Sequence, residues 1–139
     1  MSFDIKNNDP AKIAEAGYEF AVILPDGTET DFKIKVRGIN SPKVQEFWRK
    51  HYNETEMRKS AAKRRGKTEA DELTLVELEE FQARNSSARI ISWANLEEDK
   101  VAIVYSHTEA ERVMKDYKWL REIVLKESDQ LLNFRHNLS

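Results

Sequence analysis

Apolar and polar positions alternate along two stretches near the start of the chain, with the period of a β-strand that has one solvated face. The apolar positions are Tyr18, Phe20, Val22 and Leu24 in the first stretch, and Phe32, Ile34 and Val36 in the second. Pro25-Asp26-Gly27 lies between them and is typical of a turn, because proline presets φ, aspartate bonds its own backbone and glycine accepts a positive φ. The pattern predicts an antiparallel β-hairpin within residues 1–40. Two strands alone are marginal in water, so its apolar face is expected to pack on helices or on another chain.

The period changes to that of a helix after Gly38. Ser41 suits an N-cap and Pro42 suits the first helical position. One apolar stripe follows at helical spacing: Val44, Phe47, Trp48 and Tyr52. We predict a helix over about 41–65 that ends at Gly66, and a mobile connection near 66–72.

A second helix is predicted over about 74–94. Thr74 and Glu77 form the pattern of a capping box, and Leu73 and Leu78 stand where a hydrophobic staple requires apolar residues. The expected buried face of this helix consists of Leu75, Leu78, Phe81, Ala88, Ile91 and Trp93. The apolar run 101–105 fits either a strand or an extended link between helices.

Two more helices are predicted in the last third of the chain. Ser106 and Glu109 repeat the capping pattern and open a helix over about 107–116, and apolar residues at helical spacing predict a helix over about 118–134. No glycine or proline occurs after Lys67, which also favours helices there. The sequence therefore predicts a single domain over 1–139 of the α+β class, with an N-terminal antiparallel β-hairpin and a mainly α-helical C-terminal two-thirds.

Composition excludes several classes of protein. The 139 residues contain no cysteine, so a disulfide scaffold, a thiolate metal site and a cysteine nucleophile are all excluded. The 23 Lys and Arg residues nearly balance the 25 Asp and Glu residues, so net charge indicates no particular partner. Residues 1–10 lack the apolar run of a signal peptide, and no stretch approaches the roughly 18 apolar residues of a membrane span. These features fit a protein of a reducing cytosol.

Catalytic patterns are missing from the sequence. The three histidines lie far apart, adjacent acid pairs such as Glu79-Glu80 do not share a helix face, and there is no glycine-rich phosphate loop or Gly-x-Ser-x-Gly elbow. We therefore expect no enzyme, no catalytic residue, no cofactor and no metal site.

A basic run within residues 58–67 supports an alternative function. Its members are Arg58, Lys59, Lys63, Arg64, Arg65 and Lys67, and clustered charge of this kind binds phosphates. Trp48 and Tyr52 would have to stack on bases, but they share a face with Val44 and Phe47, which favours core packing. A nucleic-acid-binding module is thus a less favoured hypothesis.

The order of short motifs in the last third indicates a family. Trp93 is followed by the run 101–106, by Thr108-Glu109-Ala110 and Tyr117-Lys118-Trp119-Leu120, and finally by Asp129 and Asn133-Phe134. In this order the motifs resemble the tail assembly chaperones of lambda-like, long-tailed bacteriophages of the siphovirus and myovirus type. Gly38-Ile39-Asn40-Ser41 after the hairpin is similar to the N-terminal half of the same family. Lys118 stands where the family has proline, so the last two helices are expected either to break there or to run on with a bend.

The resemblance implies a non-catalytic protein of the host cytoplasm that is absent from the mature virion. Such chaperones bind and solubilise the tape measure protein, whose long apolar helices would otherwise aggregate, and they help to recruit tail tube subunits. Members commonly self-associate, and many are also made as a longer frameshifted form that reaches the major tail tube protein. This chain resembles the short form. Membranes and nucleic acids are not expected partners.

A groove between amphipathic helices is the expected binding site for an apolar helix of the tape measure protein. Val113, Trp119, Leu120 and Phe134 are the candidate partner-binding residues that would form its walls. The alternative interpretation is that all four residues belong to a closed core. The alternative function is a small phage tail structural or completion protein, which would remain in the particle.

Overall fold

A computed structural model describes residues 2–67 and 73–135 of the protein, and the fold is α+β as predicted. The elements before the undescribed segment are α1 (Pro10–Ala16), β1 (Tyr18–Ile23), β2 (Glu29–Val36) and α2 (Pro42–Arg64). Those after it are α3 (Leu75–Ser87), β3 (Ile90–Ala94), β4 (Glu97–Glu98), β5 (Val101–Ala102), α4 (His107–Asp116), α5 (Lys118–Asp129) and the 3-10 turn η1 (Leu131–Phe134). The predicted connection 66–72 lies mostly outside the described residues.

The predicted hairpin is confirmed and forms two strands of a three-stranded antiparallel sheet in the order β1-β2-β3. Tyr18 lies opposite Val36. The turn closes where the Leu24 N–H donates to the Thr28 carbonyl at 2.9 Å, and Gly27 has the positive φ of +92° that only glycine adopts without strain.

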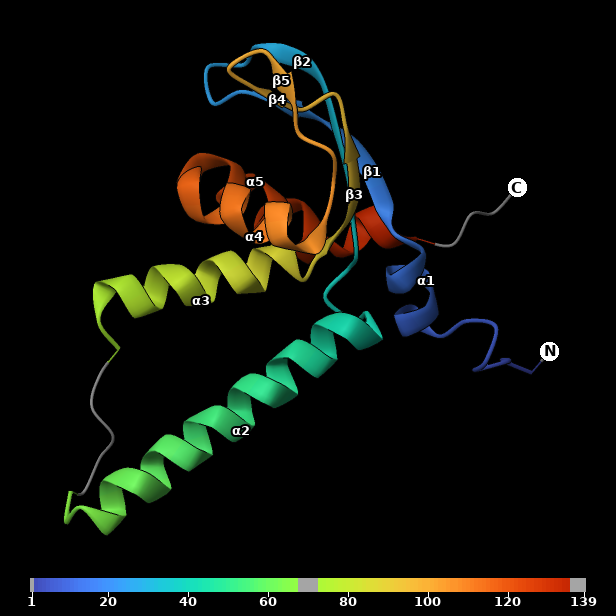
Figure 1. The fold of residues 1–139 in the computed structure, drawn as a ribbon. Helices are drawn as coiled ribbons and strands as arrows, with labels where there is room; N and C mark the ends of the chain where they lie inside the picture. The colour runs from blue at the N-terminus through green and yellow to red at the C-terminus, as the bar shows by residue number, and fades with distance from the viewer. Residues whose placement is uncertain (1, 68–72, 136–139) are drawn as a thin grey trace.

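The core lies between one face of this sheet and helices α4 and α5. Helices α4 and α5 cover the sheet, and α3 lies beside α4 (Figure 1). The fully buried large side chains of the sheet are Val22, Ile34, Val36 and Ile90, and those of the two helices are Val113, Met114, Leu120 and Val124. Burial of each such side chain contributes about 1.5–3 kcal/mol, so the hairpin obtains from the helices the stability that two strands lack.

The prediction of one helix over 74–94 is wrong in its last third. The capping box of Thr74 and Glu77 is present, but α3 ends at Ser87 and Ile90–Ala94 form β3 instead. The hydroxyls of Ser86 and Ser87 donate to carbonyls three and four residues earlier, which competes with helix continuation. Trp93 then pairs with Ile34 of β2, and this long-range pairing overrides the local preference.

The expected buried face of that helix is wrong at its start, where Leu75 and Leu78 are exposed. The run 101–105, for which strand and link were both open, divides between the two: β5 pairs with β4 over two residues, and the rest is an extended link to α4.

The ends of the chain also differ from expectation. Asp9 caps a short helix, α1, with Pro10 at its first position, in a segment for which no element was predicted. The predicted helix 118–134 ends at Asp129, and residues 131–134 form η1. The two last helices break at Tyr117 (φ −122°, ψ 83°), so the break occurs although Lys118 is not proline.

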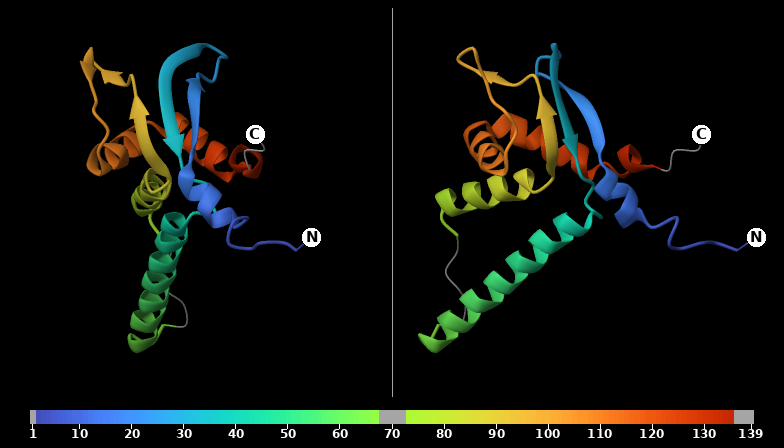
Figure 2. Two further views of the ribbon diagram at one scale, coloured as in Figure 1. Left: turned by 90° about the vertical axis from the view of Figure 1, so that its right-hand side faces the viewer. Right: turned by 45° about the vertical axis from the view of Figure 1, so that its right-hand side comes forward.

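Helix α2 projects from the body of the protein (Figure 2). Ser41 caps it as predicted. Its N-terminal half is attached to α3 through aromatic contacts, with the Phe81 ring 5.7 Å from Phe47, 5.8 Å from Trp48 and 4.3 Å from His51 between ring centroids. Phe47 and Trp48 of the predicted apolar stripe therefore contact α3, although Tyr52 at the end of the stripe is exposed.

Candidate partner-binding pocket

Three of the four candidate residues come together in one pocket. Val113 and Leu120 form its buried floor, and Trp119, with 37% of its surface exposed, forms a wall. The pocket has a volume of about 330 Å³. We call it the hairpin pocket, and its lining consists of Phe32, Leu96, Glu97, Glu98, Asp99, Ile103, Val113, Tyr117, Trp119 and Leu120.

Phe134 lies elsewhere and is not part of this pocket. Its ring packs edge-on against Tyr18 with a centroid distance of 6.1 Å. A Cβ atom added at Gly38 would lie 3.0 Å from the Ala14 Cβ and 3.1 Å from the Phe134 ring, so these neighbours would have to shift slightly to accept any other residue. Phe134, in η1, therefore lies beside the start of β1 and does not line the hairpin pocket with the other three candidates.

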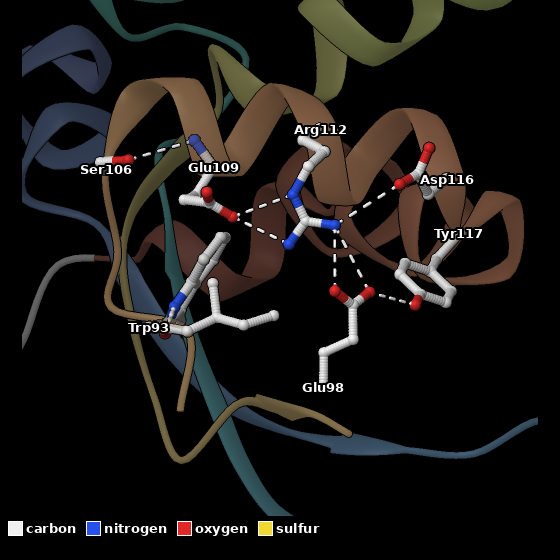
Figure 3. Close-up of polar contacts among 8 residues, drawn as sticks. Trp93, Glu98, Ser106, Glu109, Arg112, Asp116 and Tyr117 are labelled. Atoms are coloured by element: carbon white, nitrogen blue, oxygen red, sulfur yellow. Dashed lines mark hydrogen bonds and ion pairs between the residues drawn. The ribbon is translucent and has the colours of Figure 1, made fainter. Parts of the chain in front are cut away.

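The β4–β5 hairpin positions the outer wall of the pocket. Asp99 and Lys100 at its turn adopt positive φ values of 51° and 66°. The Ile103 N–H donates to the Leu96 carbonyl at 2.8 Å. The indole N–H of Trp93, whose ring is labelled in Figure 3, donates to the Ile103 carbonyl at 2.8 Å. Because β3 is itself fixed in the sheet, Trp93 anchors the apolar side chains of the hairpin segment over α4 and α5.

A charged cluster on the rim of the hairpin pocket joins the β4–β5 hairpin to α4 (Figure 3). The Arg112 guanidinium donates to Glu109 at 2.8 and 3.0 Å, to Glu98 at 3.4 Å and to Asp116 at 3.5 Å. The Tyr117 hydroxyl donates to the same Glu98 carboxylate. Glu98 therefore receives hydrogen bonds from α4, through Arg112, and from the α4–α5 joint, through Tyr117, which ties the β4–β5 hairpin to both.

These contacts shift the ionisation of the cluster. The hydrogen bond from Tyr117, followed by that from Arg112, lowers the pKa of Glu98 below its ordinary value. The same hydrogen bond to Glu98 raises the pKa of Tyr117. The Glu98 carboxylate is thus held ionised, and its contribution to the free energy of unfolding is present above pH 4.5 and is lost as the pH falls through the lowered pKa.

Replacing Tyr117 with phenylalanine is expected to raise the pKa of Glu98 toward its ordinary value, because the largest stabilising hydrogen bond to the carboxylate is removed. Side-chain carboxyl NMR titration of the two proteins measures this change. Tyr52→Phe is the control, because Tyr52 is exposed on α2. An unchanged Glu98 pKa in Tyr117→Phe would mean that, in solution, the Tyr117 hydroxyl does not bind Glu98 and so does not hold the β4–β5 hairpin in place.

The lining of the hairpin pocket suits an apolar side chain with a basic neighbour. Phe32, Leu96 and Ile103 supply apolar walls, and three consecutive acids, Glu97, Glu98 and Asp99, form one rim. The volume is at the lower end for ligand pockets, so it accommodates one or two large side chains and not a whole helix. An amphipathic helix recognised by anchor residues at helical spacing is the kind of partner that fits.

A second cleft lies between α2 and α3, with a volume of about 510 Å³. Its floor is Phe81 and His51, but most of its lining is charged: Glu54, Arg58, Lys59, Glu77, Glu80 and Arg84. Arg58 pairs with Glu77 at 3.1 Å across it. This mixed charge fits an apolar helix less well than the hairpin pocket does.

The basic run predicted at 58–67 lies at the end of α2. Arg58 faces Glu77 and Lys59 faces Glu56 at 3.5 Å, while Lys63, Arg64 and Arg65 are exposed on the last turn and at the C-cap. Trp48 packs against Phe47 and Phe81, so its ring is held in an aromatic cluster with them.

Within residues 2–67 and 73–135, no group of three or more His, Cys, Asp or Glu side chains has the arrangement of a metal site. In the same part of the chain, no helix combines the length and apolar character that crossing a bilayer requires. Sequence reasoning missed Leu96, Ile103 and Tyr117 as pocket residues. Ile103 and Tyr117 belonged to motifs of the family resemblance, but nothing in those motifs assigned them to a pocket. Leu96 gave no signal, because the β4–β5 hairpin was not predicted.

Comparisons with protein-family profiles, with curated proteins and with solved structures give no match to this chain.

Proposed function

We propose that this protein is a phage tail assembly chaperone that binds and solubilises the tape measure protein during tail morphogenesis without catalysing a reaction. The observation that supports this most is the hairpin pocket. Val113, Trp119 and Leu120, singled out through the family resemblance, lie 80 or more residues after Phe32 in the sequence, and all four line one apolar depression that opens to solvent.

The proposed binding event inserts one or two apolar anchors of an amphipathic tape measure helix into the hairpin pocket. Trp119 is exposed on one side and would be covered by the partner, which is how tryptophan contributes to interfaces. The acidic rim would face basic residues that flank the anchors. A single small pocket gives modest affinity, but many copies along one tape measure protein supply avidity.

Recruitment of tail tube subunits is the second part of the proposed role. We assign it to a longer, frameshifted form whose extra domain reaches the major tail tube protein. The short chain would then coat the tape measure, and the long form would bring the tube protein to it. The place of action is the host cytoplasm, and both forms would leave before the virion is complete.

Co-expression with the tape measure protein of the same phage tests the proposal. We expect the tape measure protein to become soluble and to co-purify with this chain, because its apolar helices would be covered. Expression of the tape measure protein alone is the control and should give insoluble material. A tape measure protein that stays insoluble in both cases would refute the chaperone role.

Mass spectrometry of purified particles separates this role from that of a structural or completion protein. A chaperone should be absent from the particles. Stoichiometric retention of this chain in the virion would favour the structural alternative.

A further inference from the structure

One edge of the sheet is left without a pairing strand in the described part of the chain. The order β1-β2-β3 places β1 and β3 at the two edges. Beside β3 the chain returns from the β4–β5 hairpin, and the Tyr105 hydroxyl donates to the Ile90 carbonyl at 3.1 Å. The other side of β1 is open in both views of Figure 2. An open edge of this kind is a template for a further strand.

The sequence of β1 does nothing to prevent such pairing. Edge strands are normally protected by lysine, proline or a bulge. Tyr18–Ile23 contains a single charge, Glu19, and neither lysine nor proline. Ala21 pairs with Lys33 and Ile23 pairs with Glu29, so the extra residues of the bulge belong to β2 and β1 itself stays regular.

The direction of the main-chain groups identifies the residues that face the open edge. The Leu24 N–H donates to the Thr28 carbonyl at 2.9 Å, and the Val22 carbonyl accepts from the Thr30 hydroxyl at 2.7 Å. Both residues therefore turn their main-chain groups toward β2. Alternation along the strand turns those of Glu19, Ala21 and Ile23 toward the open edge.

An apolar cleft of about 470 Å³ follows this edge and separates β1 from α5. Its apolar lining is Phe20, Ile23, Trp119 and Ile123. Three charged side chains of α5, Glu122, Lys126 and Glu127, line the same cleft. The Glu127 carboxylate accepts a hydrogen bond from the Asn133 side chain at 2.8 Å, whereas Glu122 and Lys126, one helical turn apart, present opposite charges. We call it the edge cleft, and it shares only Trp119 with the hairpin pocket.

We propose that two copies of this chain pair antiparallel through β1, about a two-fold axis at Ala21, and so form a continuous six-stranded sheet. This register places Ala21 opposite Ala21 and Glu19 opposite Ile23, so every edge-facing residue is paired and no charge meets a like charge. It also keeps both apolar faces on the same side, because Phe20 then lies opposite Val22.

The charges on α5 favour a second copy over an unrelated strand. The two-fold axis stands perpendicular to the sheet, so α5 and its symmetry mate run antiparallel beside the junction. Glu122 of one copy then faces Lys126 of the other, and the reverse, which is self-complementary in an isologous interface. Ile23 and Ile123 of both copies line the edge cleft at this junction.

A single introduced cysteine tests the register, because the natural chain has none. Directly opposed residues in an antiparallel pair have Cα atoms about 4.5–5.5 Å apart, which a disulfide spans. We expect Ala21→Cys to form a covalent dimer under mild oxidation. Lys33→Cys is the matched control, since Lys33 is exposed and lies opposite Ala21 on the middle strand. Equal cross-linking of both variants, or none in Ala21→Cys, would overturn the register.

Sedimentation equilibrium of charge variants tests the interface itself. Wild type is expected to be a dimer, and Ala21→Lys and Ala21→Glu are each expected to be monomers, because like charges would be opposed at the axis. An equimolar mixture of the two variants should form dimers again. A monomeric wild type, or variants that remain dimers alone, would refute the proposal. The experiment needs no tape measure protein, so its result is independent of the proposed function.

Discussion

Replacing Asp129 with alanine is expected to lower the free energy of unfolding by about 2–4 kcal/mol, more than replacing its ion-pair partner Arg89 with methionine, which should cost about 1–2 kcal/mol. The two side chains form an ion pair at the end of α5. Arg89 is 3% exposed and Asp129 is 52% exposed. Loss of Asp129 leaves a buried charge with weaker partners, whereas loss of Arg89 leaves a carboxylate that water already reaches.

The surroundings of Arg89 increase the expected difference in stability between the two variants. Its guanidinium also donates to the Asn85 side chain at 3.3 Å and to the Ser128 hydroxyl at 3.4 Å, but its Nε has no partner among the described atoms. Methionine removes that unsatisfied donor together with the charge. Urea denaturation measures the free energy of unfolding of both variants, and an unchanged m-value shows that the differences are differences in stability.

Asp116→Ala is the surface control and should change stability by no more than about 1 kcal/mol, because its pairing with Arg112 is solvated. A larger loss in Arg89→Met than in Asp129→Ala would contradict this account of the buried charge.

Much of the fold could be predicted because its signals are local. The hairpin follows from period-two alternation and the turn at Gly27, and α2 and α3 begin at the predicted caps, Ser41 and Thr74. Each of these features depends on residues that lie close to one another in the sequence. Ser106 also caps α4 as predicted, although Glu109 turns to Arg112 and does not reach back.

The features that were missed depend on distant residues. β3 exists because Trp93 and Ile90 pair with β2, more than 50 residues earlier, and its sequence fits the end of a helix equally well. The break at Gln130 has no glycine or proline to announce it. Asp9 and Pro10 at the start of α1 form an N-cap and first-position pattern from which this helix could have been predicted.

The candidate site was only partly predictable, because some of its residues have a local signal and others depend on distant pairing. Val113 and Leu120 were identifiable as apolar helix positions, but the sequence alone did not distinguish buried floor from exposed wall. That distinction depends on the β4–β5 hairpin, which leaves Trp119 partly open. Phe134 was assigned to the same groove, but η1 turns it toward Tyr18.

Replacing Trp119 with alanine is expected to weaken the binding of a tape measure helix by about 30-fold, or roughly 2 kcal/mol, which is the effect of removing a tryptophan at the centre of an interface. The ring forms a wall of the hairpin pocket and is available to a partner on its exposed side. The expected loss arises in binding, so Trp119→Ala should still unfold cooperatively.

Trp48 provides a matched control within the same chain. It is also 37% exposed, but it lies on α2 against Phe47 and Phe81, away from the hairpin pocket. Trp48→Ala should leave affinity for the tape measure helix unchanged, because Trp48 does not line the hairpin pocket. It is a matched control because the two tryptophans have the same exposed fraction.

Titration calorimetry of the wild type, Trp119→Ala and Trp48→Ala with apolar helical segments of the tape measure protein compares the three directly. If the hairpin pocket receives the partner, wild type and Trp48→Ala bind one of these segments equally well and Trp119→Ala binds it about 30-fold more weakly. Absence of binding to every segment, or equal losses in the two tryptophan variants, would contradict the proposal that this pocket is where the protein binds its partner.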